Sequence, residues 1–307
     1  MQFRTAAHEA IAKAFHGKNH GFIPDGDQFR LQKDAGLRFG GATPTQASLQ
    51  QWQAPLIDQG KTGHCGGAGT SQIVYTAMGA AGTPLPWVPS PRSIYGLART
   101  LARLNASQGL TDSGIMPFYL LAVLSQFGVQ PIQAPTPDGR YDDVWGPDDL
   151  VGLPAARPNV NDEISLLDLE SSGLRLLTGQ YRVNESGANA INQITSALSQ
   201  KIPAGIGIFV DSGFEWWDPT TGPIKTINLG DPQGGGHWLA CTYFYTHPLL
   251  GLVLGGPNSW NDLWPSADPS ASVPGSPFWK PGHYEITATA LQSAMTDCLL
   301  FPCKVIS

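Results

Sequence analysis

Residues 58–69 read DQGKTGHCGGAG and place a glutamine, Gln59, six positions before a cysteine, Cys65. The residues that follow, SQIVYTAM (71–78), carry apolar side chains at the spacing of a buried helix. We therefore expect Cys65 to lie where a loop enters a helix. Unpaired N–H groups and the helix dipole favour a thiolate at such a position. The Gln59 amide can donate a hydrogen bond to a developing oxyanion. A buried structural cysteine is the alternative for this stretch taken alone.

The composition is typical of a globular chain with many ordered loops. Of the 307 residues, 41% are hydrophobic and 14% are charged, with 36 Gly and 26 Pro. The net charge is −6 without a basic block, so nucleic acid is not an expected partner. The sequence has neither an apolar run of membrane-spanning length nor the apolar core of a signal peptide. We therefore expect no membrane association, and a location in the cytoplasm or inside a virion or other assembly.

The cysteine count argues against a disulfide framework. Four cysteines are too few for such a scaffold in a chain of this length. Cys298 and Cys303 are close enough in sequence to form a bridge. Because no export signal is present, we expect them to remain two separate thiols.

Apolar periodicity predicts helices in the first half of the chain and strands in the second. The predicted helices are 94–104, 115–127 and 188–198. The predicted strands are 202–210, 237–245, 249–256 and 283–287. Turn-rich connections between the strands favour an antiparallel sheet. The order indicates an α+β fold in two halves with a cleft between them. We place an N-terminal extension at 1–45 and one domain at 46–307, with a helical half at 46–200 and a β half at 201–307.

Two residues of the second half can complete a site around Cys65. His237 follows the glycines 234–236 and opens a predicted strand, although a strand histidine beside a flexible turn is the alternative. Asn258 lies 21 positions further on, where its carboxamide oxygen can accept a hydrogen bond from the His237 ring and fix its tautomer. Trp260 and Trp264 are large apolar side chains that can keep water from this bond. Cys65 and His237 are too few ligands for zinc, so we expect no metal and no cofactor.

Along the chain the candidate site residues come in the order Gln59, Cys65, His237 and Asn258. This order is typical of the papain-like cysteine peptidases, which the chain therefore resembles. The resemblance covers about residues 48–286. The motif YGLARTLAR (95–103) followed by DSG (112–114) is similar to the bacterial and viral branch of this family. The resemblance implies a two-lobed α+β fold, with a helical N-terminal lobe and a barrel-like antiparallel sheet in the C-terminal lobe.

The resemblance also implies hydrolysis of a peptide or protein substrate by acyl transfer. Cys65 is then the nucleophile, and the Gln59 side chain holds the oxyanion together with the Cys65 N–H group. His237 moves the proton and Asn258 orients His237. The residues expected to contact substrate are Gly66, Gly67, Gly235, Gly236 and Trp260.

The chain departs from the family pattern at three places. Gly66 stands where the family has an aromatic residue after the nucleophile, and Thr62 stands where it has a paired cysteine. The segment Pro265–Lys280 separates Trp264 from the GHYEI motif. These departures leave open a scaffold of the same fold, for example in a virus or phage particle, that contacts neighbouring chains through residues 1–45. A peptidoglycan amidase with the same Cys–His chemistry is the third hypothesis.

Overall fold

The computed structural model describes most of the chain between residues 44 and 305. The described residues are 44–59, 63–101, 114–126, 128–129, 131, 176–178, 181–183, 186–260, 264–266, 268 and 270–305. Residues 1–43 of the predicted extension, and Thr62, lie outside this part. Among the described residues, no helix combines the length and the apolar character needed to cross a membrane.

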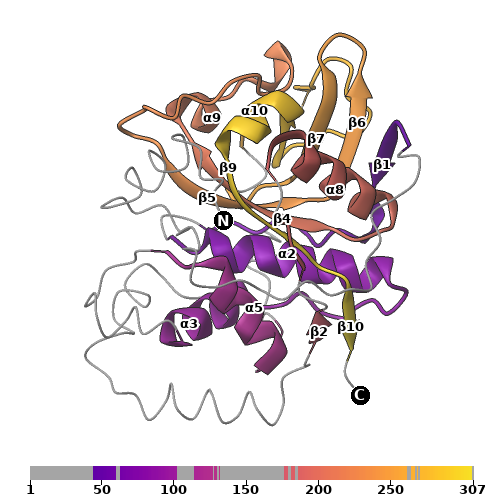
Figure 1. Ribbon diagram of the computed structural model, residues 1–307, viewed down its shortest axis with the longest axis vertical. Coiled ribbons are helices and arrows are strands. Elements are labelled where there is room, and N and C mark those ends of the chain that lie inside the picture. The colour runs from indigo at the N-terminus through magenta and orange to yellow at the C-terminus, as the bar shows by residue number, and fades with distance from the viewer. Residues whose placement is uncertain are drawn as a thin grey trace.

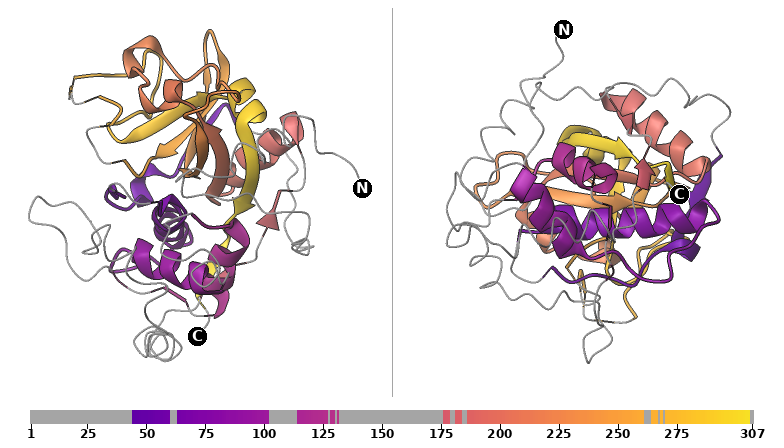
Figure 2. Two further views of the ribbon diagram at one scale, coloured as in Figure 1. Left: turned by 90° about the vertical axis from the view of Figure 1, so that its left-hand side faces the viewer. Right: turned by 90° about the horizontal axis from the view of Figure 1, so that it is seen from below.

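The helices fall into two groups that lie on different sides of the molecule. Three of them, α2 (Cys65–Ala80), α3 (Pro91–Leu101) and α5 (Pro117–Gln126), lie together below the two four-stranded sheets in Figure 1, and Figure 2 shows the same separation from the side. The others lie among the strands and are α8 (Gly187–Ser199), α9 (Ser212–Glu215), α10 (Ala288–Ala294) and the 3-10 turns η1 (Gln50–Trp52) and η2 (Pro219–Thr221). The helices and antiparallel sheets of the predicted α+β fold are thus present, although α8 and strand β1 (Gln46–Ser48) of the first half lie with the strands of the second.

The strands form two antiparallel sheets of four strands and one separate pair. The strands are β1 (Gln46–Ser48), β2 (Leu176–Thr178), β3 (Tyr181–Arg182), β4 (Ala204–Val210), β5 (Gly235–Cys241), β6 (Tyr243–His247), β7 (Gly251–Pro257), β8 (His283–Thr287), β9 (Met295–Leu300) and β10 (Cys303–Val305). Their orders are β1-β6-β7-β8, β3-β9-β4-β5 and β10-β2. Both larger sheets are open within the described residues, so the barrel-like closure expected from the resemblance is not seen.

The segment 237–245, predicted as one strand, is divided between two sheets, so that prediction was wrong in this detail. The first part of this segment, up to Cys241, belongs to β5. The chain turns at Thr242, and β6 begins at Tyr243. The Thr242 N–H group donates to Gly255 O (3.0 Å), and β7 crosses the segment at this point. A Cβ on Gly256 would lie 1.9 Å from Ala240 O, so this crossing requires glycine.

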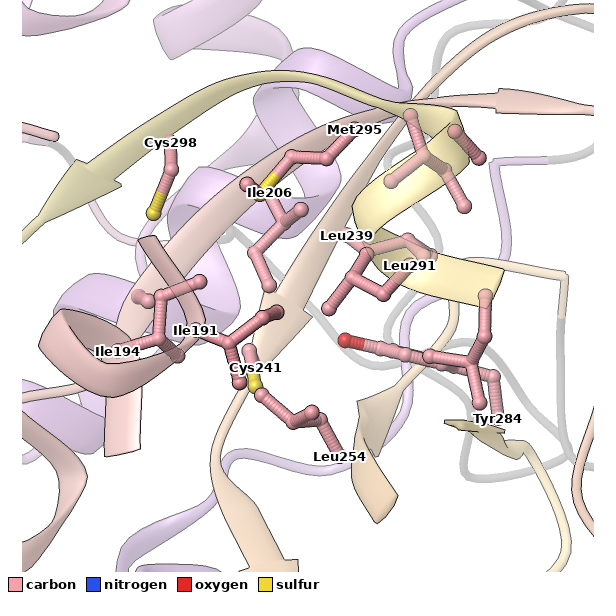
Figure 3. Packing of buried hydrophobic residues seen from close by; sticks show 14 of the residues in the cluster. Ile191, Ile194, Ile206, Leu239, Cys241, Leu254, Tyr284, Leu291, Met295 and Cys298 are labelled. Atoms are coloured by element: carbon pink, nitrogen blue, oxygen red, sulfur yellow. The ribbon is translucent and has the colours of Figure 1, made fainter. Parts of the chain in front are cut away.

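The core of the β half is built from two helices packed on strands. Figure 3 shows Ile191 and Ile194 of α8 and Leu291 of α10 beside Ile206 of β4 and Leu239 of β5. All five side chains are buried. Helix α8 precedes residue 201 in sequence, yet its apolar face contributes to the core of the second half.

Two thiols lie inside this core. Cys241 and Cys298 are buried and free, and Figure 3 shows them among the apolar side chains. Burial raises the pKa of Cys241 to about 12 and raises that of Cys298 as well. Both therefore stay protonated. The expectation that Cys298 is a separate thiol is confirmed, whereas the side chain of Cys303 lies outside the described part.

Helix α2 and strand β5 are in direct contact, and this contact joins the two halves. A Cβ on Gly69 would lie 2.8 Å from Trp238, and one on Gly205 of β4 would lie 2.2 Å from the same ring. The two glycines therefore let α2 approach the sheet closely around Trp238. Gly69 is one helical turn after Cys65, and Trp238 follows His237, so this contact brings the start of α2 toward His237.

Candidate active site

Cys65 is the first residue of α2, as its sequence context predicts. Its side chain is buried. The residue before it, His64, ends the loop without a side-chain hydrogen bond to the helix, and the first turn of α2 holds no acidic residue. The N–H groups and the dipole at this end therefore favour a negative charge on a group placed there.

The glycines after Cys65 are explained by close packing. A Cβ on Gly66 would lie 2.6 Å from Ile115 Cγ2, and a Cβ on Gly67 would lie 2.1 Å from Pro91 O. Ile115 thus fills the place where a side chain on residue 66 would project, which accounts for the missing aromatic residue. Both glycines are buried, and their contact with substrate stays a prediction.

His237 and Asn258 are joined by a hydrogen bond, as the sequence predicted. His237 Nε2 lies 2.7 Å from Asn258 Oδ1, and both side chains are buried. The Ser259 N–H group donates to the same Asn258 atom at 2.8 Å, which fits a carbonyl oxygen. Because this oxygen can only accept, His237 Nε2 must carry a proton, and the neutral ring then has its lone pair on Nδ1.

Aromatic rings cover the His237–Asn258 bond. Trp260 stacks on the His237 ring with centroids 4.7 Å apart and an angle of 27° between the planes. Phe214 of α9 meets the same ring edge-on at 6.3 Å, and Trp264 stacks on Phe214 at 5.5 Å. Trp260 was predicted for this cover. Phe214 was not, because the short helix α9 gives no periodic signal in the sequence.

Gln59 is held against the segment that carries Asn258. Its N–H group donates to Ser259 O at 2.8 Å, and its Oε1 accepts a hydrogen bond from Ser259 Oγ. Asp58 and Trp260 form a β-bridge beside this contact. Ser259 thus engages the Gln59 oxygen, and the amide nitrogen at the same end of the side chain is a hydrogen-bond donor. Sequence reasoning missed Ser259, whose only signal is its position directly after Asn258.

Two of the three glycines before His237, Gly235 and Gly236, belong to β5. Gly235 pairs with Val210 and Gly236 pairs with Phe209, both on β4. Both glycines are buried, and their contact with substrate also stays a prediction. The structure therefore places the two predicted glycine pairs beside Cys65 and His237, respectively.

The carboxylates near His237 hold the loops in place. Asp211 accepts from Phe214 N (2.8 Å) and from Asn228 N (2.7 Å). Asp231 accepts from Ser212 N at 2.8 Å. Among the described residues, no group of three or more His, Cys, Asp or Glu side chains could hold a metal ion.

No protein-family model matches the chain, and no curated protein matches it in sequence. Solved structures do match it. Xylellain, a cysteine protease from Xylella fastidiosa, superposes with a TM-score of 0.60 at 16% identity, over 94% of this chain and 97% of that chain. Procathepsin B S9 from Trypanosoma congolense gives 0.54 at 13% identity, over 91% and 86%. Bromelain from Ananas comosus gives 0.50 at 13% identity, over 84% and 98%. The chain therefore has the papain-like α+β fold of cysteine proteases.

Proposed function

We propose that the chain is a papain-like thiol peptidase. The observation that carries this proposal is the buried His237–Asn258 hydrogen bond, covered by Trp260, on a strand packed against the helix that begins with Cys65. A structural histidine does not need an orienting amide, a covering ring and an adjacent helix start that carries a thiol. A nucleophile–base pair needs the thiol and a group that orients the base, and the ring keeps water from the orienting bond.

The proposed reaction proceeds in two steps. His237 Nδ1 takes the proton of Cys65, and the Cys65 sulfur attacks the peptide carbonyl carbon. The Gln59 amide and the Cys65 N–H group stabilise the oxyanion. His237 then protonates the leaving amine as the C–N bond breaks, which gives a thioester. In the second step His237 takes a proton from water, the hydroxide attacks the thioester, and the Cys65 thiolate leaves.

Labelling with a peptidyl epoxide tests this proposal. The expected result is one label, on Cys65, together with hydrolysis of a denatured protein substrate. The chain provides its own controls, since Cys241 and Cys298 are buried in the β-half core with raised pKa values and should stay unlabelled. A folded protein without a label on Cys65 would contradict the proposal.

Alkylation with iodoacetamide at different pH values tests the Cys65–His237 pair itself. The alkylation rate should rise at a pH well below that of a free thiol, about 8.5, and this rise should shift in His237→Ala. A single rise near pH 8.5 that His237→Ala leaves unchanged would show that the two groups are not coupled.

Two other hypotheses predict different outcomes in the same experiments. A scaffold of an assembly, suggested by Gly66, would keep the fold without labelling, although the Ile115 contact gives Gly66 a packing role instead. A peptidoglycan amidase would be labelled but would release products from cell wall rather than from protein. Incubating untreated protein with cell wall and with protein substrate therefore decides the substrate class.

A further inference from the structure

The motif YGLARTLAR, which the proposed mechanism does not use, places two buried polar side chains on one face of α3. Tyr95 and Arg99 are four positions apart, so they are neighbours on the helix. The Arg99 guanidinium carbon lies 5.5 Å from the centre of the Tyr95 ring, and Arg99 Nη1 donates to Tyr95 Oη at 3.3 Å. Tyr95 is fully buried and Arg99 is 4% exposed. A guanidinium this deeply buried is costly unless its donors are used.

Both side chains bind the backbone of Gly114, the last residue of the DSG motif. The Gly114 N–H group donates to Tyr95 Oη at 3.1 Å, and Gly114 O accepts from Arg99 Nη1 at 3.1 Å. Gly114 has φ +82°, a conformation that favours glycine. Its donor and its acceptor are therefore both taken by α3, which fixes the direction in which the chain continues to Ile115.

Ile115 lies directly against the first turn of α2. A Cβ on Gly66, the residue after Cys65, would lie 2.6 Å from the Ile115 Cγ2 atom. On the neighbouring face of the same turn, a Cβ on Gly67 would lie 3.0 Å from the Tyr95 Cβ. The Tyr95 ring is also 6.1 Å from the ring of His64. The two motifs thus surround the start of α2 from two sides.

We propose that Tyr95 and Arg99 are positioning residues, which hold Gly114 and the buried Ile115 against the start of α2 and so fix the position of Cys65 and its N–H group. This inference rests on the proposed function. A peptidyl reagent that reacts at Cys65 depends on the position of the whole helix start, including the Cys65 N–H group, whereas a small alkylating reagent needs only the thiolate.

Tyr95→Phe tests the inference, because it keeps the ring and removes the acceptor of the Gly114 N–H group. The second-order rate of inactivation by a peptidyl epoxide should fall about tenfold, which corresponds to about 1.4 kcal/mol. The rate of alkylation by iodoacetamide should stay within about twofold. Arg99→Lys, which keeps the charge but loses the fork of donors, should give a smaller loss of the same kind.

Tyr245→Phe is the matched control. It removes a buried hydroxyl that donates to Glu285 Oε2 at 2.7 Å in the β half, so both rates should stay unchanged. An unchanged epoxide rate in Tyr95→Phe would overturn the inference. A parallel fall of both rates together with Tm would also overturn it, since that result indicates a general loss of structure.

Amide hydrogen exchange separates this inference from the proposed function. A wild-type chain that no epoxide labels would contradict the peptidase proposal alone. In that case Tyr95→Phe should still speed exchange at Gly114 and in the first turn of α2. Faster exchange at Gly114 with no change in α2, or no change in either segment, would show that Tyr95 does not position the helix start.

Discussion

Two buried histidines, His237 in β5 and His283 in β8, occupy similar surroundings. Each ring has its Nε2 atom beside a carboxamide oxygen, at 2.7 Å from Asn258 for His237 and at 3.0 Å from Gln53 for His283. Each also stacks on an aromatic ring, with a centroid distance of 4.7 Å in the first case and 6.4 Å in the second. An amide partner and a stacked ring therefore do not by themselves identify a catalytic histidine.

The places of the two rings in the fold separate the two sites. His283 Nδ1 lies 3.2 Å from Pro281 O, so both nitrogens of this ring lie beside protein oxygens. Burial lowers the pKa of His283 to about 4, which keeps the ring neutral in ordinary buffers. His237 instead belongs to the strand that α2 approaches, and α2 begins with Cys65. The difference is thus that His237 lies on a strand packed against a helix that begins with a thiol.

The largest expected effect comes from replacing each histidine by glutamine. His237→Gln should lower kcat by roughly 10³–10⁴-fold, since it removes the general base and acid. His283→Gln should leave kcat within about threefold and lower Tm, because this ring only joins β8 to the segment of Gln53. Peptide hydrolysis and thermal unfolding measured on both variants check this. Equal losses of kcat would mean that the two sites are not functionally distinct.

Two glutamines, the buried Gln59 and the half-buried Gln53, extend the comparison. Gln59→Ala should lower kcat by roughly 10²–10³-fold with the fold intact, as expected for one lost oxyanion donor. Gln53→Ala removes contacts with His283 and Thr242, so it should cost about 1 kcal/mol of stability and leave kcat unchanged. Steady-state kinetics and urea unfolding provide the two measurements. An effect of Gln59→Ala on KM alone would place Gln59 in the pocket wall instead.

The sequence was sufficient to predict the local elements that carry the site. Cys65 follows a loop and precedes a helical pattern, and the strand 283–287 was predicted with its observed bounds. Helix α3 begins at Pro91, three residues before the predicted start, because Ser90 Oγ accepts from Ser93 N (3.3 Å) and caps the helix. Such signals act over a few residues, so periodicity and capping rules can detect them.

Contacts between distant segments were not predictable in the same way. Ser259 contacts Gln59 across 200 residues of sequence, and nothing in either local pattern indicates this pairing. Tyr95 and Arg99 were noted as part of a motif, yet their binding to Gly114 depends on how α3 packs. The division of one apolar run into β5 and β6 likewise depends on the crossing of β7. These features are set by tertiary packing rather than by local preference.

His283 and Glu285, two residues apart in β8, predict opposite effects of pH on stability. Burial raises the pKa of Glu285 from 4.5 to about 7, although Ser276 and Tyr245 donate hydrogen bonds to it. Its contribution to stability is complete below pH 4.5 and is lost as the pH rises to 7. The contribution of His283, whose pKa falls from 6.5 to about 4, is complete above pH 6.5 and is lost as the pH falls to 4.

Between pH 4.5 and 6.5 these two contributions to the unfolding free energy have opposite slopes and cancel. Glu285→Gln should therefore show stability that rises with pH in this window, and His283→Gln should show stability that falls. Each change across the window should be roughly 3 kcal/mol. Urea unfolding at pH 4.5, 5.5 and 6.5 measures both slopes. Parallel profiles in the two variants would contradict the assignment.

The smallest expected effect comes from the stacked rings. Trp260→Phe keeps an aromatic ring over His237 but covers less of its bond to Asn258, so water should reach that bond. We expect kcat to fall about 3–10-fold, which is the size of one aromatic contact.

Tyr243→Phe is the matched change at the other histidine. It keeps the ring over His283 and removes a hydroxyl that lies 3.4 Å from Tyr284 O, so Tm should fall slightly while kcat stays unchanged. Steady-state kinetics and thermal unfolding of both variants give the comparison. Trp260→Phe could instead lower Tm, as Tyr243→Phe does, and leave kcat unchanged. That result would show that the ring over His237 contributes to packing and not to catalysis by this histidine.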